Sequence, residues 1–209
     1  MSTDSFVLVA YRNRCGYSAT MKALLIAEVK TQSPFGFRSD KSWEELFAIA
    51  NLHGDMLSIH TDERWGGSFE LLQKARDMTD KPILAKGIHA RDEDVARAVA
   101  LGADKVLVVG RVPAVHVEKC IIEPYTLEEL RALPLGASAV WNSRDLTTGG
   151  LKPDDFANAR AVHTGWLCQA SNICSIDDVD PTADAVLVGQ NLETFIQSLK
   201  IYQAKKRNC

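Results

Sequence analysis

Eight short runs of strand-forming residues recur along this chain, and amphipathic segments separate them. This alternation restricts the possible folds more than any other feature of the sequence. The runs cover residues 26–30, 55–61, 82–88, 103–110, 118–124, 137–143, 165–171 and 184–190. Strands that alternate with helical segments are typical of parallel sheets joined by right-handed crossovers. Because there are eight such strands in series, the pattern favours a closed α/β barrel over an open sheet.

Apolar spacing and local capping residues predict six helices between these runs. They cover residues 42–52, 68–78, 91–101, 127–133, 153–162 and 192–205. The connections at 111–117 and 174–183 are too short for a full helix, so we expect shortened fourth and seventh helices. The chain has 209 residues, whereas a (β/α)8 TIM barrel typically needs about 250. We therefore expect a minimal (β/α)8 barrel.

Composition and charge limit the other possibilities. With 46% hydrophobic residues and no linker, residues 1–209 are expected to form one domain. The net charge is −3 and the basic residues are scattered, which argues against a nucleic-acid partner. The first residues lack the order of a signal peptide, and no apolar span reaches membrane length, so a cytoplasmic protein without membrane contact is expected. The spacing of the five cysteines and five histidines predicts neither a metal site nor a disulfide framework.

Polar side chains close several of the apolar runs. Glu28 and Lys30 lie two residues apart, so they point to the same face of the first strand. Lys86, Glu123 and Asn142 end the third, fifth and sixth runs. Barrels of this class carry their chemistry at the C-terminal rim, where such groups would shift one another's pKa. The pattern therefore predicts an acid/base site, although Glu28 and Lys30 considered alone are also consistent with an ordinary edge ion pair.

Five motifs occur in order between residues 26 and 199. They are E-V-K-x-x-S-P with Glu28, Lys30 and Ser33, T-D-E-x-W-G-G-S from Thr61 to Ser68, P-I-L-A-K ending at Lys86, I-I-E ending at Glu123, and N-S-R-D-L from Asn142. Their order and strand placement resemble the signature of the indole-3-glycerol-phosphate synthase family. The resemblance implies a lyase that closes the indole ring of 1-(2-carboxyphenylamino)-1-deoxyribulose 5-phosphate. Carbon dioxide and water are lost, and neither a metal nor an organic cofactor is needed.

The resemblance also implies catalytic roles for the rim residues. Lys86 would protonate the alkoxide that forms when the ring carbon attacks the ketose, and Lys30 would pair with the substrate carboxylate. The two lysines can exchange acid roles between steps, and the sequence leaves that choice open. Glu123 would accept the proton in dehydration, Glu28 would orient Lys30, and Asn142 would hold a substrate hydroxyl or amine.

Further residues are expected to bind the substrate. Ser33 and Ser171 match family serines, and Arg144 is expected to anchor the rim through salt bridges. Gly189 and Gln190 close the last run, next to the loop where such barrels cradle a phosphate. A small phosphorylated aromatic molecule is therefore the expected partner.

Aromatic and histidine residues near the strand ends add weaker expectations. Trp65, in the second loop, and Trp141, beside Asn142, are expected to stack on an aromatic substrate. For His60 and His89 both substrate contact and packing in the core or rim stay open.

Several positions depart from the family pattern. The usual E-S-G is Ala170-Ser171-Asn172, the usual G-S or G-E is Gly189-Gln190, and the usual D-F is Gly87-Ile88. The loop after the second strand is one residue shorter, and the family's N-terminal extension over the barrel mouth is almost absent. The alternatives are therefore a divergent paralogue with a related substrate, or a non-catalytic or partner-dependent subunit with a partner protein over the open mouth.

Overall fold

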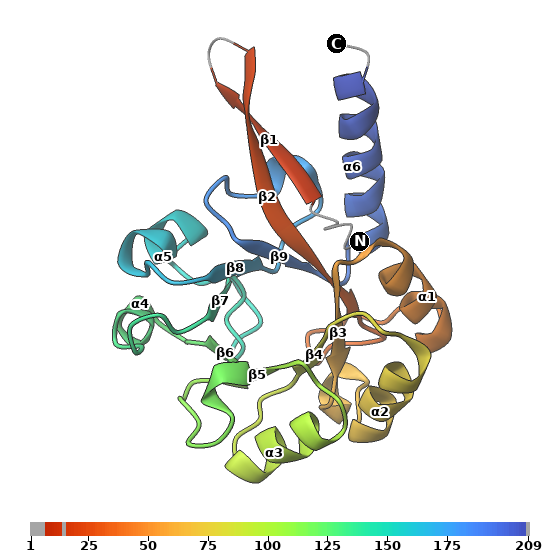
Figure 1. Cartoon of the computed structure of the whole chain (residues 1–209), viewed down its shortest axis with the longest axis vertical. Helices are drawn as coiled ribbons and strands as arrows, with labels where there is room; N and C mark the ends of the chain where they lie inside the picture. Colours follow the sequence, from red (N-terminus) through yellow and green to blue (C-terminus); the bar gives the residue numbers. More distant parts are fainter. Residues whose placement is uncertain (1–6, 14–15, 208–209) are drawn as a thin grey trace.

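Eight parallel strands close into a barrel in the computed structural model, which describes residues 7–13 and 16–207 (Figure 1). The barrel strands are β2 (Gly16–Val29), β3 (Met56–His60), β4 (Ile83–Lys86), β5 (Lys105–Val109), β6 (Cys120–Glu123), β7 (Ala139–Asn142), β8 (Leu167–Ala170) and β9 (Ala185–Val188). Each strand pairs with the next one, and β9 returns to β2 through pairs such as Ile26 with Leu187. The predicted (β/α)8 barrel is thus confirmed.

Six helices surround the barrel in the described part of the chain. They are α1 (Trp43–His53), α2 (Phe69–Met78), α3 (Asp92–Ala100), α4 (Leu127–Arg131), α5 (Phe156–Val162) and α6 (Leu192–Arg207). In place of full helices, the chain has single 3-10 turns at the end of the first predicted short connection, η2 (Val117–Lys119), and within the second, η3 (Ile176–Asp178). A third turn, η1 (Glu63–Trp65), follows β3. The shortened fourth and seventh helices are therefore confirmed. No helix among the described residues is long and apolar enough to cross a membrane.

Side-chain caps decide where several helices begin. Ser42 and Glu45 form a reciprocal capping box at α1, with Ser42 Oγ accepting from the Glu45 N–H at 3.2 Å. Helix α5 starts later than the predicted residue 153, because Asp155 caps it by accepting from the Asn158 N–H at 2.9 Å. The predicted helix was therefore too long by three residues at its start.

The first strand differs most from its prediction. Strand β2 begins at Gly16 rather than at residue 26, and β1 (Val7–Asn13) pairs with its first half in an antiparallel hairpin. Only the stretch from Leu24 to Val29 pairs with the barrel neighbours β3 and β9. The hairpin consequently extends from the end of the barrel where the strands begin. It projects in the same direction as the C-terminal end of α6 (Figure 1).

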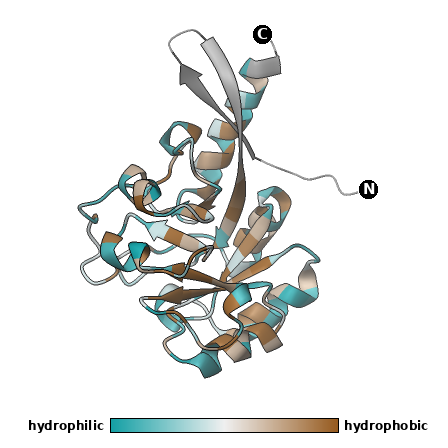
Figure 2. Ribbon diagram, turned by 60° about the vertical axis from the view of Figure 1, so that its left-hand side comes forward, coloured by the Kyte–Doolittle hydropathy of each residue, from teal (hydrophilic) through white to brown (hydrophobic). Residues whose placement is uncertain are grey.

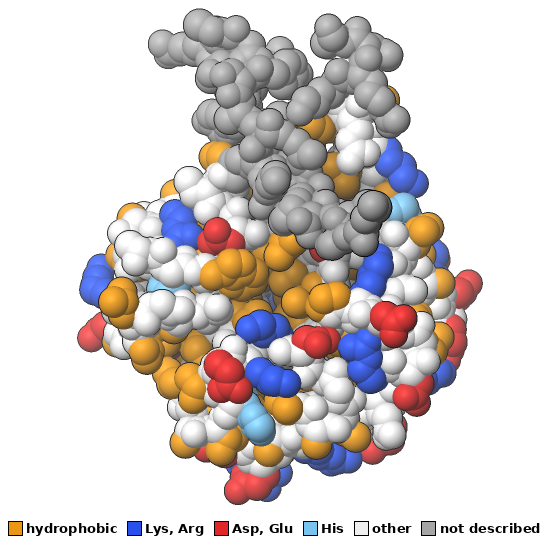
Figure 3. All heavy atoms as spheres, in the orientation of Figure 1, with side chains coloured by type: hydrophobic (Ala, Val, Ile, Leu, Met, Phe, Trp, Pro, Cys, Tyr) orange, Lys and Arg blue, Asp and Glu red, His pale blue; other side chains and the backbone are white. Residues whose placement is uncertain are grey.

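Alternating strand residues build separate hydrophobic cores inside and outside the barrel. Inward-facing side chains such as Ile26, Leu84 and Leu107 fill the barrel. Outward-facing side chains such as Leu57 and Ile83 pack beneath the helices. In Figure 2 the apolar strands accordingly lie inside a shell of helices that carry both hydrophobic and hydrophilic residues. In the face shown by Figure 3, apolar side chains gather at the centre and charged side chains surround them.

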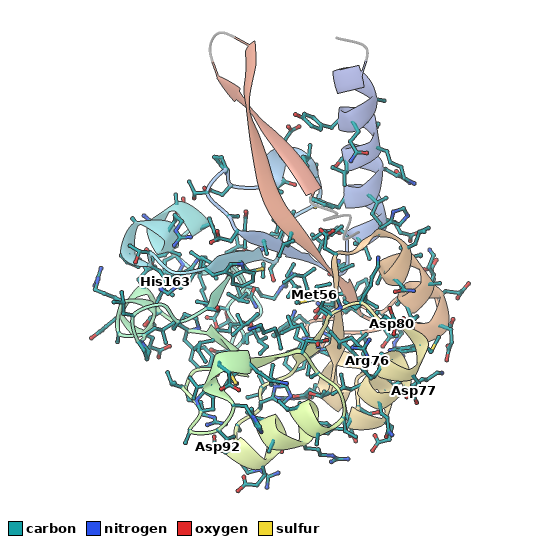
Figure 4. The ribbon with its side chains drawn as sticks, viewed as in Figure 1. Met56, Arg76, Asp77, Asp80, Asp92 and His163 are labelled. Carbon is teal, nitrogen blue, oxygen red and sulfur yellow. The ribbon has the colours of Figure 1, made fainter. Side chains whose placement is uncertain are left out.

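Aspartates secure the end of the barrel where the strands begin. Asp55, Asp104 and Asp184 precede β3, β5 and β9, and their Oδ2 atoms accept the backbone N–H groups of Leu25, Ile83 and Leu167 at 2.8, 2.9 and 2.8 Å. Arg76 of α2, labelled in Figure 4, also pairs with Asp104 at 3.2 Å. This end of a barrel contributes to stability, which leaves the opposite end for chemistry.

Candidate active site

Five polar side chains meet inside the C-terminal end of the barrel. Glu28 comes from β2, His60 from β3, Lys86 from β4, Glu123 from β6 and Asn142 from β7. Strand pairing brings neighbours level, since His60 lies opposite Lys86 in the register of β3 and β4. Four of the five are at most 4% exposed, and the Lys86 side chain is 15% exposed. Such deeply buried polar groups require partners.

Glu28 is the centre of this network. Its Oε1 accepts from Lys86 Nζ at 2.5 Å and from His60 Nε2 at 2.8 Å. Its Oε2 lies 4.0 Å from Lys30 Nζ. Glu123 forms a second pair, in which Asn142 Nδ2 donates to Glu123 Oε1 at 2.8 Å. One carboxylate is therefore held between cations, and the other has a neutral amide partner.

These surroundings shift the pKa values of the two glutamates and the two lysines in different directions. Burial would raise the pKa of Glu28, but Lys86, Lys30 and His60 outweigh it and hold that pKa well below the usual value. Burial opposes the charge of Lys86 too, but Glu28 and Glu123 raise its pKa overall. For Lys30, burial prevails and lowers the pKa. For Glu123, burial also prevails and raises the pKa, against the opposing effects of Lys86 and Asn142.

A cavity of about 450 Å³ opens above this cluster. Its lining includes the predicted residues Lys30, Trp65, Lys86, Glu123, Asn142, Arg144 and Ser171, together with the apolar side chains Phe35, Ile88, Leu107, Val109 and Leu146. Lys30, Lys86, Glu123 and Asn142, which come from four different strand ends, thus line one space. The catalytic and binding roles assigned to these residues stay predictions.

An adjoining cavity of about 530 Å³ lies beside the last two strand ends. Gly189, Gln190 and Asn172 line it, and it shares Lys30 and Arg144 with the first cavity. The loops after β8 and β9 each have a constrained position. A Cβ at Gly189 would lie 1.7 Å from Glu28 Oε2, so any side chain there would displace the Glu28 carboxylate. Asn172 keeps a left-handed backbone with φ of 56°, which asparagine tolerates better than most residues, although the family glycine is missing.

Two predicted binding residues have contacts other than those expected. Ser33 lies outside the linings of both cavities, and its Oγ accepts the N–H groups of Phe35 at 3.3 Å and Phe37 at 3.4 Å. Arg144 lines both cavities, but its Nη1 donates to the Gly149 carbonyl at 3.1 Å. The expected salt bridges of Arg144 are absent among the described residues. A backbone carbonyl therefore anchors this rim position.

The two tryptophans have opposite surroundings. Trp65 lines the cavity and stacks on His60, with ring centroids 6.0 Å apart and planes 1° from parallel. Trp141 is 1% exposed and packs beneath the helices, where its Nε1 donates to the Asp154 carbonyl at 3.2 Å. The prediction that Trp141 stacks on substrate is wrong, because neighbouring strand residues face opposite sides and Asn142 occupies the inner side.

Sequence reasoning did not place His60 in the cluster, although its position at the end of an apolar run was a signal. The other histidine left open, His89, is 5% exposed, and its Nδ1 hydrogen-bonds the Leu107 carbonyl. That contact supports packing rather than substrate contact. No group of three or more metal-ligating side chains suited to a metal ion occurs among residues 7–13 and 16–207.

Fold and site together define a (β/α)8 barrel with a buried cluster of ionisable groups at the C-terminal ends of its strands. The model of the indole-3-glycerol phosphate synthase family matches residues 11–198. The chain therefore belongs to the indole-3-glycerol phosphate synthase family.

Individual relatives agree with this assignment. Indole-3-glycerol phosphate synthase of Sulfurisphaera tokodaii is 31% identical over 93 residues, which cover 44% of this chain and 38% of that protein. Tryptophan biosynthesis protein TrpCF of Vibrio parahaemolyticus is 32% identical over 196 residues, 82% of this chain and 41% of that protein. The chain thus spans less than half the length of these two relatives. A crystal structure of 3-hexulose-6-phosphate synthase superimposes with a TM-score of 0.58 at 14% identity, over 82% of this chain and 99% of that one, and shows the shared fold alone.

Proposed function

We propose that this protein is an indole-3-glycerol-phosphate synthase, a carboxy-lyase of tryptophan biosynthesis. Its substrate would be 1-(2-carboxyphenylamino)-1-deoxyribulose 5-phosphate. The observation that carries the proposal is the Lys86–Glu28 pair, which shares one mouth with Glu123 and Asn142. Cytoplasmic residence belongs to the same proposal, and fractionation of the producing cells would test it.

Lys86 suits the first step, in which the carboxylate-bearing ring carbon attacks the ketose carbonyl. A carbon–carbon bond forms, and the carbonyl oxygen takes a proton from the Lys86 ammonium. The raised pKa of Lys86 keeps that proton in place at neutral pH until the alkoxide develops. Loss of carbon dioxide then returns the bonding electron pair to the ring. Lys30, on the rim beside Glu28, supplies the positive charge that pairs with the substrate carboxylate before this bond breaks.

Glu123 suits the dehydration that completes the indole ring. The hydroxyl leaves as water after a lysine protonates it, and Glu123 accepts the proton released from the substrate. Because burial raises the pKa of Glu123, its carboxylate is a stronger base than an exposed glutamate. Asn142 fixes Glu123 Oε1 through its amide, so the other oxygen is left for the substrate.

The adjoining cavity is the proposed phosphate site. Gly189 and Gln190 line it immediately before the 16-residue helix α6, whose first backbone N–H groups favour an anion. Lys30 and Arg144 reach the same cavity and add positive charge. This arrangement would place the substrate ring beside Trp65 and Phe35 in the first cavity.

An activity assay tests the proposal directly. The purified protein is incubated with the substrate, and indole fluorescence is followed. The variant Lys86→Met should lower kcat by about 10²- to 10⁴-fold, the usual contribution of a general acid. Lys105→Met is the matched control, because Lys105 begins β5 at the opposite end of the barrel. A Lys86→Met protein with full activity would contradict the assignment of the acid.

Binding without turnover is the competing function. The specific observation in its favour is Ala170, which ends β8 where the family pattern has a glutamate, so one carboxylate is missing from the rim. Measurable binding of the substrate without product at high protein concentration would support that function and refute the synthase proposal.

A further inference from the structure

His60 is in direct contact with the Glu28–Lys86 pair at the proposed reaction centre. It is 4% exposed, and its Nε2 lies 2.8 Å from Glu28 Oε1. The same oxygen accepts from Lys86 Nζ at 2.5 Å. Trp65 stacks on one face of the ring, and the two ring planes are parallel. The imidazole thus packs against an indole ring and hydrogen-bonds a carboxylate at its edge.

The two oxygens of Glu28 have different surroundings. Oε2 lies against Gly189, where even a Cβ would approach to 1.7 Å, and 4.0 Å from Lys30 Nζ. Oε1 therefore has to serve both His60 and Lys86. The His60 donor on that oxygen limits rotation of the Glu28 carboxylate. The position of the Lys86 ammonium, which is bonded to the same oxygen, therefore depends on the imidazole.

The contacts of His60 also define its protonation. A carboxylate only accepts hydrogen bonds, so Nε2 carries the proton. Nδ1 is buried and has no hydrogen-bond partner among the described residues, so a proton there would be an unsatisfied donor. The charged groups that face the ring are Glu28 of β2, the adjacent Lys30, Lys86 of β4 and Asp62 of the following loop. Burial, with Lys86 and Lys30, outweighs the opposing effect of Glu28 and lowers the pKa of His60, which agrees with a neutral ring.

We infer that His60 is a positioning residue: its neutral imidazole donates Nε2–H to Glu28 Oε1 and thereby fixes Lys86 for proton transfer. The inference rests on the proposed function, because it assumes that Lys86 is the acid. His60 itself exchanges no proton with the substrate. It acts on the rate through the geometry of the Glu28–Lys86 pair, while substrate affinity depends on other residues.

Two substitutions separate the donor from the bulk of the ring. His60→Leu keeps much of the volume and removes the donor, and it should lower kcat about tenfold to a hundredfold, the effect of losing a hydrogen bond to a charged group, with KM unchanged. His60→Gln has an amide donor that reaches toward the same oxygen, so it should recover most of kcat. His163→Gln is the matched control, since His163 is 6% exposed and hydrogen-bonds the Ala137 carbonyl at 3.0 Å. It lies at the end of α5 (Figure 4) and should leave kcat unchanged.

The outcomes are distinct. Equal kcat for wild type and His60→Leu, or equal losses in the Leu and Gln variants, would overturn the inference. So would the loss of a limb from the pH profile of His60→Gln, since that would make the ring itself a proton carrier. A measurement on the wild-type protein does not depend on the folding of a variant. Nitrogen-15 NMR of His60 should show the neutral Nε2–H tautomer at pH 7. An imidazolium signal at that pH would refute the inference. If wild type makes no indole, the proposed function fails, whereas the NMR result still reports on the His60–Glu28 bond.

Discussion

At the scale of single residues, environment rather than residue type separates the two glutamates of the mouth. Glu28 has two cations and an imidazole beside it, so its pKa is lowered and it stays charged. For Glu123 burial outweighs the opposing effects of Lys86 and the Asn142 amide, so its pKa is raised. Groups whose pKa values are pushed apart in this way suit different roles, one as a fixed charge and the other as a base.

The pH dependence of activity should report on Glu123. A base must be ionised to accept a proton, so activity falls as pH drops through the raised pKa of Glu123. The acidic limb of kcat should therefore lie above the ordinary glutamate value of 4.5. Glu123→Gln should lower kcat by about 10²- to 10⁴-fold and remove that limb. Stopped assays from acidic to neutral pH measure it, and an unchanged limb in the variant would assign the ionisation to another group.

Gly189 should tolerate no side chain. In Gly189→Ala the added Cβ would collide with Glu28 Oε2, and the carboxylate would have to leave Lys30 and Lys86. We expect a loss of activity together with a lower melting temperature. Gly150→Ala is the control, because its Cβ would meet only Thr148 Oγ1 at 3.4 Å. Equal behaviour of the two variants in assay and thermal melt would argue against the close packing of Glu28 on the β9 loop.

At the scale of elements, the end of the barrel where the strands begin contributes to stability, and the end where they finish carries the candidate site. The first residues of β3, β5 and β9 follow aspartates that accept backbone N–H groups of neighbouring strands. The C-terminal ends of β2, β3, β4, β6 and β7 contribute the polar cluster. Substitutions at the two ends should therefore have separable effects on stability and rate.

Asp104 offers a test of this division. Asp104→Ala should lower the free energy of unfolding by about 1–3 kcal/mol, because the Ile83 N–H loses its acceptor in a buried position. The value of kcat should not change, since Asp104 precedes β5 at the end opposite the mouth. Asp104→Asn keeps an acceptor oxygen and should recover most of the stability. Urea denaturation and the fluorescence assay measure the two quantities, and a large drop in kcat for the alanine variant would contradict the division.

At the scale of the whole molecule, the N-terminal hairpin is an addition to a complete cylinder. The barrel closes through Leu24 to Ala27 of β2 against β9, whereas β1 pairs with the part of β2 that precedes this stretch. The residues of both cavities all follow that part in sequence. The hairpin is thus separate from the mouth.

A shortened chain should test this separation. A protein that begins at Ala23 should retain its far-ultraviolet circular dichroism and a kcat close to that of the full chain. The physical reason is that barrel closure and all cavity-lining side chains are preserved. Lower thermal stability is compatible with this expectation. A folded but inactive shortened protein would show that the hairpin affects the mouth.

Local patterns in the sequence determined the number of barrel strands, their order, the six helices and the polar ends of the strands, because these depend on alternation and capping within a few residues. Alternation also places the Trp141 side chain on the face of the strand opposite Asn142. The start of β2 and its partner β1 were decided by pairing beyond the barrel, for which the first residues carry no clear pattern. Only the tertiary structure determined the hydrogen-bond partner of His60. Glu28 lies 32 positions away in the sequence, and only the closing of the cylinder brings its carboxylate to the imidazole.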